Sequence, residues 1–345
     1  MYDYVIVTHL PVFYKVNLYN QLAKKLRIHV IFISTDTSEK RAGDFNVLDR
    51  SNFSYTLLNT CCFQDRNTLL SCCNLVRQLK TLNFKKLIVS GWDLAEFWCA
   101  VLMTPKMRNC VAIESTILDS AVHGFRGIIK KLFLSRISVV FASGQMHIDL
   151  VRQLGFSGVI KKTLGVGVIN PLLIVNKINK SIYTGKFLFI GRLTAVKNLA
   201  STVAFFKAHP ELSLTIIGTG EDEAMLRAMD ANNVDFLGAI NNDALAAHFM
   251  SHDFLLLPSL KETWGLVVEE ALNLNVPVLI SDRCGSMDLI ENGVNGLIFS
   301  PRDSDSLNLV IESIDQALFE KLLKGASSFS ITNKDEYQVR QYVEL

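Results

Sequence analysis

The sequence predicts an α/β protein of two Rossmann-like domains, each a doubly wound parallel sheet, that face one another across a cleft. Three observations support this prediction. The chain of 345 residues is long for one domain and sufficient for two. Apolar strand-like runs alternate with helical stretches along the chain, as in parallel sheets with crossover helices. The alternation breaks once, around Leu164-Gly-Val-Gly-Val-Ile-Asn-Pro171, and then resumes.

In the first half, short apolar runs alternate with stretches of helical spacing. Runs such as Tyr4-Val-Ile-Val-Thr8 have the length and composition of buried strands. We expect strands at 4–8, 28–34, 86–90, 110–114 and 137–142. The stretches between them predict helices at 15–26, 66–82, 94–103, 124–135 and 145–154.

The second half repeats this alternation. Its apolar runs predict strands at 186–190, 213–217, 234–237, 253–257, 277–281 and 296–299. Helices are expected near 197–208, 221–231, 242–251, 265–274, 285–291 and 304–325, with a closing helix at 335–342. We therefore expect a first domain at 1–170, a linker at 171–184, a second domain at 185–328 and a C-terminal helical segment at 329–345.

The net charge of +2 hides an uneven distribution of charged residues. Residues 1–170 contain 21 Lys and Arg against 11 Asp and Glu, whereas residues 171–345 contain 14 against 22. The basic half points to an anionic partner. Nucleic acid is not expected, because no helix-turn-helix, zinc or RNP-type signature is present. An anionic membrane surface fits better; the alternative is that the two oppositely charged halves only attract each other.

The sequence lacks the signals typical of export or membrane insertion. It starts on a strand-like run without a basic and then apolar leader. No apolar run approaches the roughly 20 residues needed to span a bilayer. Its seven cysteines lack the C-x-x-C spacing of metal ligands. We expect a cytoplasmic protein with reduced thiols, which can associate peripherally with the inner face of the cell membrane.

The run Glu262-Thr-Trp-Gly-Leu-Val-Val-Glu-Glu270 is the most informative motif. It follows the apolar strand Asp253-Phe-Leu-Leu-Leu-Pro258 and enters a helix. Gly265 lets a ligand approach the backbone closely, and the helix N-terminus favours a phosphate. The terminal carboxylates lie at most about 12 Å apart if the run is helical. That reach suits a nucleotide sugar; the alternative is an ordinary helix with an acidic first turn.

In this motif the chain resembles the retaining glycosyltransferases of the GT-B fold, specifically the GT4 family (glycosyl transferases group 1). Members carry E-x-[F/W]-G-x-x-x-x-E in the C-terminal domain, and G-R-L-x-x-x-K-[N/G] after that domain's first strand. The second pattern matches Gly191-Arg192-Leu-Thr-Ala-Val-Lys197-Asn198. Two strand-and-turn segments of the family match Leu214-Thr-Ile-Ile-Gly218-Thr-Gly220 and Val234-Asp-Phe-Leu-Gly238. The match runs in register over about 187–300 and is weaker over 1–170.

The resemblance implies a donor site in the second domain. Arg192 and Lys197 would stabilise the charge that a diphosphate leaving group gains. Glu262 would hold hydroxyls of the donor sugar and Glu270 those of the ribose. The backbone amides of 264–266 would face the sugar and the phosphate. The residues implied in donor binding are Gly191, Arg192, Lys197, Gly218, Glu262, Thr263, Trp264, Gly265, Leu266 and Glu270.

The acceptor side of the first domain departs from the family pattern. His9 lies in the loop where many relatives carry a Gly-Gly pair, and Glu114 lies in or beside the position of a frequent histidine. Glu114 can orient the acceptor hydroxyl or take its proton, as a catalytic candidate beside Glu262, Arg192 and Lys197; alternatively, it only caps the next helix. Further acceptor-side candidates are His9, Trp92, Ser115 and His123. A loop histidine without a partner is usually inert, and Trp92 can stack on a sugar or simply pack.

Two further motifs have structural interpretations. Gly218-Thr-Gly220 lacks the third glycine of a dinucleotide fingerprint, because Glu223 stands there, so it predicts a tight turn beside the nucleotide. Asp303-Ser-Asp305 resembles a D-x-D metal motif, but it precedes an apolar-periodic run, which favours a helix N-cap. We expect no essential metal and no cofactor besides the donor substrate, a UDP- or GDP-sugar.

The stretch 125–136 mixes basic and apolar residues at helical spacing. The pattern suits a helix lying on anionic lipid. It equally suits a helix that faces the core and has a solvated basic side.

Together with the resemblance, these features predict a retaining glycosyltransferase of the hexosyltransferase type. Its donor is a nucleotide-diphosphate sugar, and its expected acceptor is a lipid-linked saccharide in bacterial surface polysaccharide assembly (O-antigen, capsule or lipopolysaccharide). The alternatives are a nucleotide-sugar epimerase of the same fold and a non-catalytic partner that binds nucleotide sugars. The residues do not identify the base, the sugar or the linkage.

Overall fold

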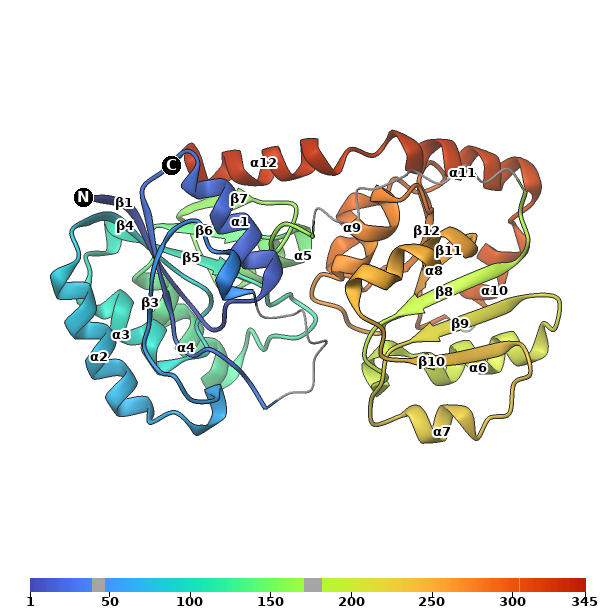
Figure 1. Ribbon diagram of the computed structural model, residues 1–345, viewed down its shortest axis with the longest axis horizontal. Coiled ribbons are helices and arrows are strands. Elements are labelled where there is room, and N and C mark those ends of the chain that lie inside the picture. Colours follow the sequence, from blue (N-terminus) through green and yellow to red (C-terminus); the bar gives the residue numbers. More distant parts are fainter. Residues whose placement is uncertain (39–46, 171–181, 304) are drawn as a thin grey trace. The chain divides into compact units, whose positions relative to one another are not determined.

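The computed structural model describes residues 1–38, 47–170, 182–303 and 305–345 of the chain (Figure 1). The contacts between residues divide the chain into two compact units. The first unit comprises Met1–Asn170 with Lys334–Leu345, and the second comprises Pro171–Asn333. Most of the expected linker, 171–181, lies outside the described residues.

The first unit contains a seven-stranded parallel sheet in the order β3-β2-β1-β4-β5-β6-β7. The order reverses between β1 and β4, which is where open α/β sheets bind ligands. The strands are β1 Tyr2–Thr8, β2 Ile28–Phe32, β3 Ser54–Leu57, β4 Phe84–Val89, β5 Asn109–Ile113, β6 Val139–Ala142 and β7 Val159–Lys162. The helices are α1 Phe13–Ala23, α2 Thr68–Thr81, α3 Ala95–Met103, α4 Gly124–Ser135 and α5 Gln145–Gln153, with short 3₁₀ turns η1 Leu48–Arg50, η2 Phe63–Asp65 and η3 Lys106–Arg108.

The sequence did not predict the two edge strands of this sheet, β3 and β7. Both are four residues long and none of their residues is buried. An edge strand needs no continuous apolar run, because one of its sides is not paired. The strands β2 and β6, by contrast, are buried at every position, and their apolar runs are visible in the sequence.

The second unit contains a six-stranded parallel sheet in the order β10-β9-β8-β11-β12-β13. Its strands are β8 Lys186–Ile190, β9 Ser213–Ile217, β10 Val234–Gly238, β11 Phe254–Leu257, β12 Val278–Ser281 and β13 Gly296–Phe299. Its helices are α6 Leu199–Ala208, α7 Glu223–Arg227, α8 Leu245–Ser251, α9 Leu266–Asn273, α10 Ser306–Glu312 and α11 Gln316–Ser328, with 3₁₀ turns η5 Ala195–Lys197, η6 Asn242–Ala244 and η7 Gly285–Leu289. The helix α12, Ile331–Val343, follows.

Two helix predictions in this unit were wrong. The segment 304–325 is not one helix, because α10 ends at Glu312 and the Asp315 carboxylate starts α11 by accepting the Leu318 amide (2.7 Å). The segment 285–291 forms the 3₁₀ turn η7 rather than an α-helix. Before α10, the Asp303 carboxylate accepts the Asp305 amide (3.1 Å), so this carboxylate stabilises a turn at the helix entry.

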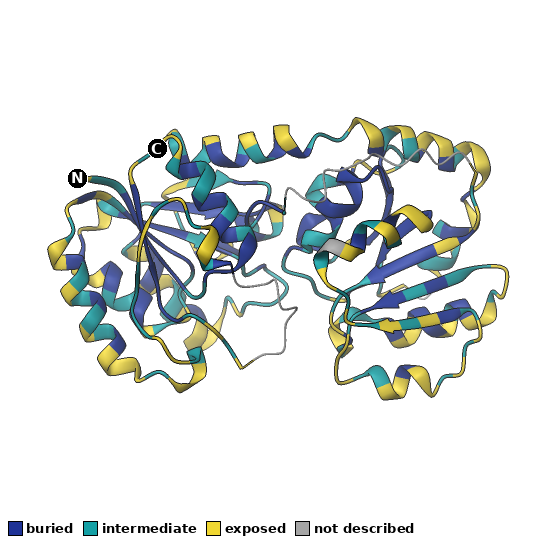
Figure 2. Ribbon diagram, viewed as in Figure 1, coloured by how far each residue is buried: buried dark blue, intermediate teal, exposed yellow. Residues whose placement is uncertain are grey.

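Each unit has its own hydrophobic core between its sheet and its helices. Figure 2 shows the strands mostly in dark blue, whereas the outer helix faces are yellow. In the second unit, Phe187 of β8 stacks on Phe254 of β11, with ring centroids 5.6 Å apart. Phe319 of α11 packs edge-on against Phe254. In the described segments, none of the helices combines the length and the apolar character that crossing a bilayer requires.

The C-terminal part of α12 packs on the sheet of the first unit. The Tyr342 ring stacks on Phe141 of β6 at 4.1 Å between centroids. The Tyr4 hydroxyl of β1 donates to the Tyr342 carbonyl (2.5 Å), and the Gln338 amide donates to the Gly165 carbonyl (2.9 Å). Tyr342 is buried, so the last residues of the chain complete a core that begins with the first strand.

We predict that Tyr342→Ala lowers the free energy of unfolding of the first unit by about 3–5 kcal/mol, because it removes a stacked ring from a closed core. Chemical denaturation followed by tryptophan fluorescence measures the change, since Trp92 and Trp98 lie in this unit. Tyr337→Ala is the matched control, because Tyr337 lies on the same helix and is only half-buried. A similar loss for both variants would contradict the prediction.

Candidate functional site

At the carboxyl edge of the second sheet, the loops after β8 and β9 pack directly on each other. The Gly191 amide donates to the Ile217 carbonyl (2.9 Å). Gly218 has a φ of +134°, and a Cβ at this position would collide with the Gly191 carbonyl. Gly218 thus forms the tight turn expected from the sequence and supports the loop that carries Arg192.

The loop after β8 presents both predicted cations. Arg192 is exposed and forms no ion pair with any described residue. Lys197 Nζ forms an ion pair with Glu262 Oε2, and their side chains are only 14% and 16% exposed. From the sequence, Lys197 was expected to bind the diphosphate and Glu262 the sugar. Because the two side chains touch, one ligand can contact both.

Hydrogen bonds on two sides hold the loop that carries Glu262. The Glu262 amide donates to the Arg283 carbonyl (3.1 Å), and the Gly285 amide donates to the Glu262 carbonyl (3.0 Å). On the other side, the Leu260 amide donates to the Val196 carbonyl (2.8 Å). These bonds join the loops after β8, β11 and β12 into one support for the Lys197–Glu262 pair.

The motif ends in α9, which starts after Gly265 at a φ of +95°. Trp264 is 2% exposed and its indole donates to Glu269 Oε1 (2.7 Å), so the ring belongs to the core and offers a ligand only its backbone. Glu270 is also buried, at 5% exposure. Thr263 and Leu266 are half-buried. Glu269, whose carboxylate fixes the indole, was not expected from the sequence.

The first unit has a cavity of about 420 Å³ at the carboxyl ends of β1, β4 and β5. The predicted residues His9, Trp92, Glu114 and Ser115 line it. Two further charged residues line the same cavity, Lys15 and Asp93, and sequence reasoning missed both as site residues. Asp93 could have been found, because it stands in the run of 91–93 directly after a predicted strand.

Lys15 of α1 and Glu114 after β5 form an ion pair in this cavity (Nζ to Oε1, 2.5 Å). The Lys15 side chain is 9% exposed and that of Glu114 is 40% exposed. Burial would lower the pKa of the Lys15 ammonium, but the Glu114 charge outweighs it, with help from Tyr19 and Tyr14, and the pKa lies above its ordinary value. From the sequence, Glu114 was expected either to orient or deprotonate the acceptor hydroxyl or to cap a helix. In the structure it forms an ion pair with the buried Lys15.

His9 after β1 and Asp93 after β4 form a second pair in the cavity (Nε2 to Oδ2, 3.1 Å). The loop histidine therefore has a partner that the sequence did not reveal. Partial burial would raise the pKa of the Asp93 carboxyl, but the hydrogen bond and charge of His9 hold it below its ordinary value. Asp93 is thus the ionised partner of the imidazole.

The remaining acceptor-side candidates occupy different positions. Ser115 follows Glu114 at the cavity. Trp92 lines the cavity and also packs against the core, and its carbonyl accepts the Trp98 indole (3.0 Å). His123 is exposed at the start of α4 and is not among the residues that line this cavity.

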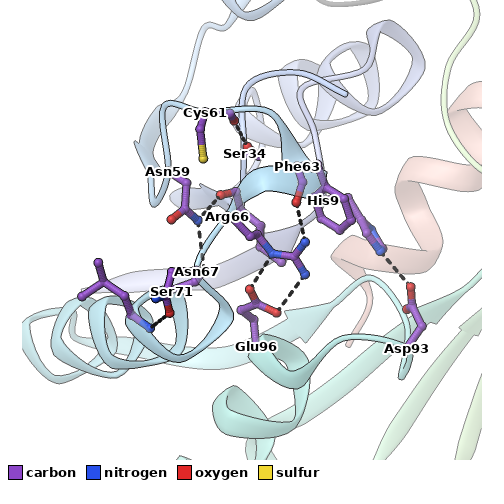
Figure 3. Close-up of polar contacts among 12 residues, drawn as sticks. His9, Ser34, Asn59, Cys61, Phe63, Arg66, Asn67, Ser71, Asp93 and Glu96 are labelled. Atoms are coloured by element: carbon purple, nitrogen blue, oxygen red, sulfur yellow. Dashed lines mark hydrogen bonds and ion pairs between the residues drawn. The ribbon is translucent and has the colours of Figure 1, made fainter. Parts of the chain in front are cut away.

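A buried ion pair supports one wall of the cavity (Figure 3). Arg66 Nε donates to Glu96 Oε1 (2.8 Å), and the Glu96 side chain is fully buried in α3. The Arg66 guanidinium also lies 3.8 Å from the centroid of the Phe63 ring and donates to the Phe63 carbonyl (2.6 Å). Because Phe63 lines the cavity, the ion pair fixes the wall that faces His9.

Comparison with known proteins identifies the second unit. Residues 175–318 match the family model described as glycosyl transferases group 1. The second unit is therefore similar to glycosyl transferases group 1 over these residues. This match agrees with the resemblance that the sequence shows over about 187–300.

The curated relatives match a part of this chain. A GDP-mannose-dependent alpha-mannosyltransferase of Mycolicibacterium smegmatis is 34% identical over 110 residues, which are 32% of this chain and 29% of the relative. The O-antigen biosynthesis glycosyltransferase WbnH of Escherichia coli is 29% identical over 155 residues, 43% of this chain and 44% of the relative. The chain thus spans less than half the length of these curated relatives.

Solved structures match the fold along almost the whole chain. The Anabaena protein HepE, crystallised with UDP, aligns at a TM-score of 0.74 and 15% identity, over 99% of this chain and 100% of HepE. The lipopolysaccharide outer core galactosyltransferase WaaB aligns at a TM-score of 0.69 and 16% identity, over 99% and 100% of the two chains. This likeness confirms the predicted GT-B fold of two Rossmann-like domains.

We predict that Arg66→Met costs about 3–5 kcal/mol of stability at neutral pH, because it leaves a buried carboxylate without its cation. Burial would raise the pKa of the Glu96 carboxyl, but hydrogen bonds from Arg66, from its own backbone and from Ser71, with the Arg66 charge, hold it below its ordinary value. In the parent protein this pair therefore stabilises the folded state at pH values above the ordinary pKa of a carboxyl group. The stabilisation is lost as the pH falls through the pKa that Glu96 has in the folded state.

In Arg66→Met the hydrogen bond and the charge of Arg66 are lost while the burial of Glu96 remains, so the carboxyl binds a proton more tightly in the folded state than it does in the parent protein. The stability difference between parent and variant should therefore shrink as pH falls from 7 towards about 4. Urea denaturation at several pH values measures this difference. A constant difference across that range would contradict the charge-based explanation.

Proposed function

We propose that this protein transfers a sugar from a nucleotide-diphosphate sugar to a hydroxyl of a saccharide acceptor, with retention of the anomeric configuration. The observation that carries the proposal is the Lys197–Glu262 ion pair at the carboxyl edge of a sheet in a glycosyl transferases group 1 domain. The exposed Arg192 and the N-terminus of α9 belong to the same set of loops.

The donor site combines cations with a carboxylate. Arg192 offers a planar set of donors to the diphosphate, and no ion pair with another described residue has to break first. Lys197 can turn from Glu262 to a phosphate oxygen, while Glu262 accepts hydrogen bonds from sugar hydroxyls. As the bond to the anomeric carbon breaks, negative charge grows on the diphosphate, and fixed cations stabilise it.

The start of α9 supplies further groups for the donor. Gly265 lacks a side chain and allows the diphosphate close to the amides of 264–266. Glu270, on the same helix, is assigned to the ribose hydroxyls. The proposed base is uracil or guanine, since HepE was solved with UDP and one relative is named as GDP-mannose-dependent.

Retention follows from attack on the face that the diphosphate leaves. The diphosphate oxygen and the acceptor hydroxyl are then neighbours on the same face of the sugar. No carboxylate of the protein has to form a covalent intermediate, unlike in the usual retaining glycosidases.

The acceptor is assigned to the first unit and to a membrane surface. The cavity offers hydroxyl-binding carboxylates at Asp93 and Glu114, and an aromatic ring at Trp92. On α4, the side chains of Phe125, Ile128 and Leu132 are exposed by 77%, 56% and 57% at helical spacing. Arg126 and Lys131 accompany them on that helix. This mixture suits a peripheral contact with anionic lipid that brings a lipid-linked saccharide to the enzyme.

The proposed setting is assembly of a bacterial surface polysaccharide on the cytoplasmic side of the membrane. The likeness to an O-antigen biosynthesis glycosyltransferase and to a lipopolysaccharide galactosyltransferase supports it. Screening UDP- and GDP-sugars for a rise in melting temperature identifies the donor, because a ligand that binds only the folded state stabilises it.

We predict that Arg192→Ala and Glu262→Ala each lower kcat about 10²- to 10³-fold, the usual effect of removing one group that stabilises transition-state charge. Transfer from the donor found in the screen to a lipid-linked saccharide is measured by product release. Arg302→Ala and Glu211→Ala are matched controls, because both parent residues are exposed in the same unit. Near-normal turnover by the Arg192 and Glu262 variants would refute the donor-site assignment.

The same assay separates the alternative functions. An epimerase would convert the donor to an isomer without acceptor and without releasing nucleotide. A non-catalytic partner would show a donor-dependent thermal shift and no turnover with any acceptor. Either result would replace the proposed transfer.

A further inference from the structure

The cavity of the first unit contains a histidine–carboxylate pair whose geometry is that of an oriented base. His9 directly follows β1 and Asp93 lies just past β4, and these strands are hydrogen-bonded neighbours in the sheet. The imidazole Nε2 and the carboxylate Oδ2 lie 3.1 Å apart (Figure 3). Eighty-four positions separate the two residues, so the pairing depends on the fold.

The loop before Asp93 is shaped to hold this carboxylate. Gly91 has a φ of +132°, a conformation that side-chain-bearing residues rarely adopt. A Cβ at Gly91 would lie 2.6 Å from Asp93 Oδ1, closer than real Cβ atoms approach. The glycine thus leaves room for the carboxylate beside the backbone, where it meets His9.

Aromatic rings restrict the imidazole. The His9 ring packs edge-on against Phe97 at 5.0 Å between centroids, and it lies tilted against Phe63 at 5.8 Å. Phe63 is fixed in turn by the buried pair of Arg66 and Glu96. A ring held by two aromatic neighbours and one carboxylate has little freedom to rotate, which is what a base aimed at a bound hydroxyl requires.

The hydrogen bond decides which nitrogen can accept a proton. An ionised carboxylate only accepts hydrogen bonds, so Nε2 carries the hydrogen and Nδ1 keeps the lone pair. No described residue forms another hydrogen bond with this ring. The charged groups around it are already paired, Lys15 with Glu114 and Arg66 with Glu96.

We propose that His9 takes the proton of the acceptor hydroxyl and that Asp93 is the positioning residue that orients its imidazole. The inference rests on the proposed function. The acceptor oxygen forms a bond to the anomeric carbon, and its proton passes to Nδ1. The bond from the anomeric carbon to the diphosphate oxygen breaks, and its electron pair leaves with the nucleotide. The imidazolium then returns the proton to solvent.

The test separates this step from proton transfer to the departing diphosphate. In His9→Gln we expect kcat to fall about 10²- to 10⁴-fold with little change in acceptor KM, as for loss of a general base. The pH dependence of kcat should differ between the parent and His9→Gln, because only the parent carries the base that accepts the proton. Asp93→Asn keeps the base but loses its orientation, so its kcat should fall less than that of His9→Gln.

His209→Gln and Asp65→Asn are matched controls, because neither parent residue lines the cavity. Circular dichroism and the thermal shift with the donor confirm that each variant folds and binds. An unchanged pH profile in His9→Gln would overturn the proposal, as would a kcat near that of the parent. Absence of donor binding in the parent protein would instead refute the proposed function, so the two failures are distinguishable.

Discussion

The parallel register that sets Val7 of β1 opposite Val89 of β4 positions the polar groups of the first unit. Both strands end at the same edge of the sheet, so the residues that follow them meet there. On the other side of β4, β5 delivers Glu114 to this edge, where Lys15 of α1 reaches it. The backbone hydrogen bonds between the strands fix where each strand ends. The residues that directly follow the strand ends are therefore held near one another.

Ion pairs between distant residues recur at both candidate sites. Lys15 pairs with Glu114, Arg66 with Glu96, and Lys197 with Glu262. A buried charge costs several kcal/mol unless an opposite charge and hydrogen bonds accompany it, so each of these lysines and arginines depends on its carboxylate. Arg192 is exposed instead and forms no ion pair with another residue that the structure describes, so an anionic ligand can approach it.

Local patterns predicted the second unit most closely. Apart from the edge strand β10, its strands are largely buried and are short apolar runs, as Phe187 to Ile190 illustrates. The edge strands β3 and β7 lack such runs and were missed. The break between α10 and α11 depends on one side-chain cap, Asp315, within a continuous helical pattern. The motif did not predict the role of the Trp264 side chain. The ring packs in the core, although the backbone of Trp264 lies in the candidate site.

The sequence by itself determined two α/β halves and the donor motifs, since Arg192, Lys197, Glu262 and Gly265 lie within short segments whose strand-to-loop positions follow from local apolar runs. Only the tertiary structure decided the partners. Nothing near His9 in the sequence indicates Asp93, because the pair exists only when β1 and β4 become neighbours in the sheet. The order of strands depends on long-range packing and crossover connections, which local periodicity does not encode.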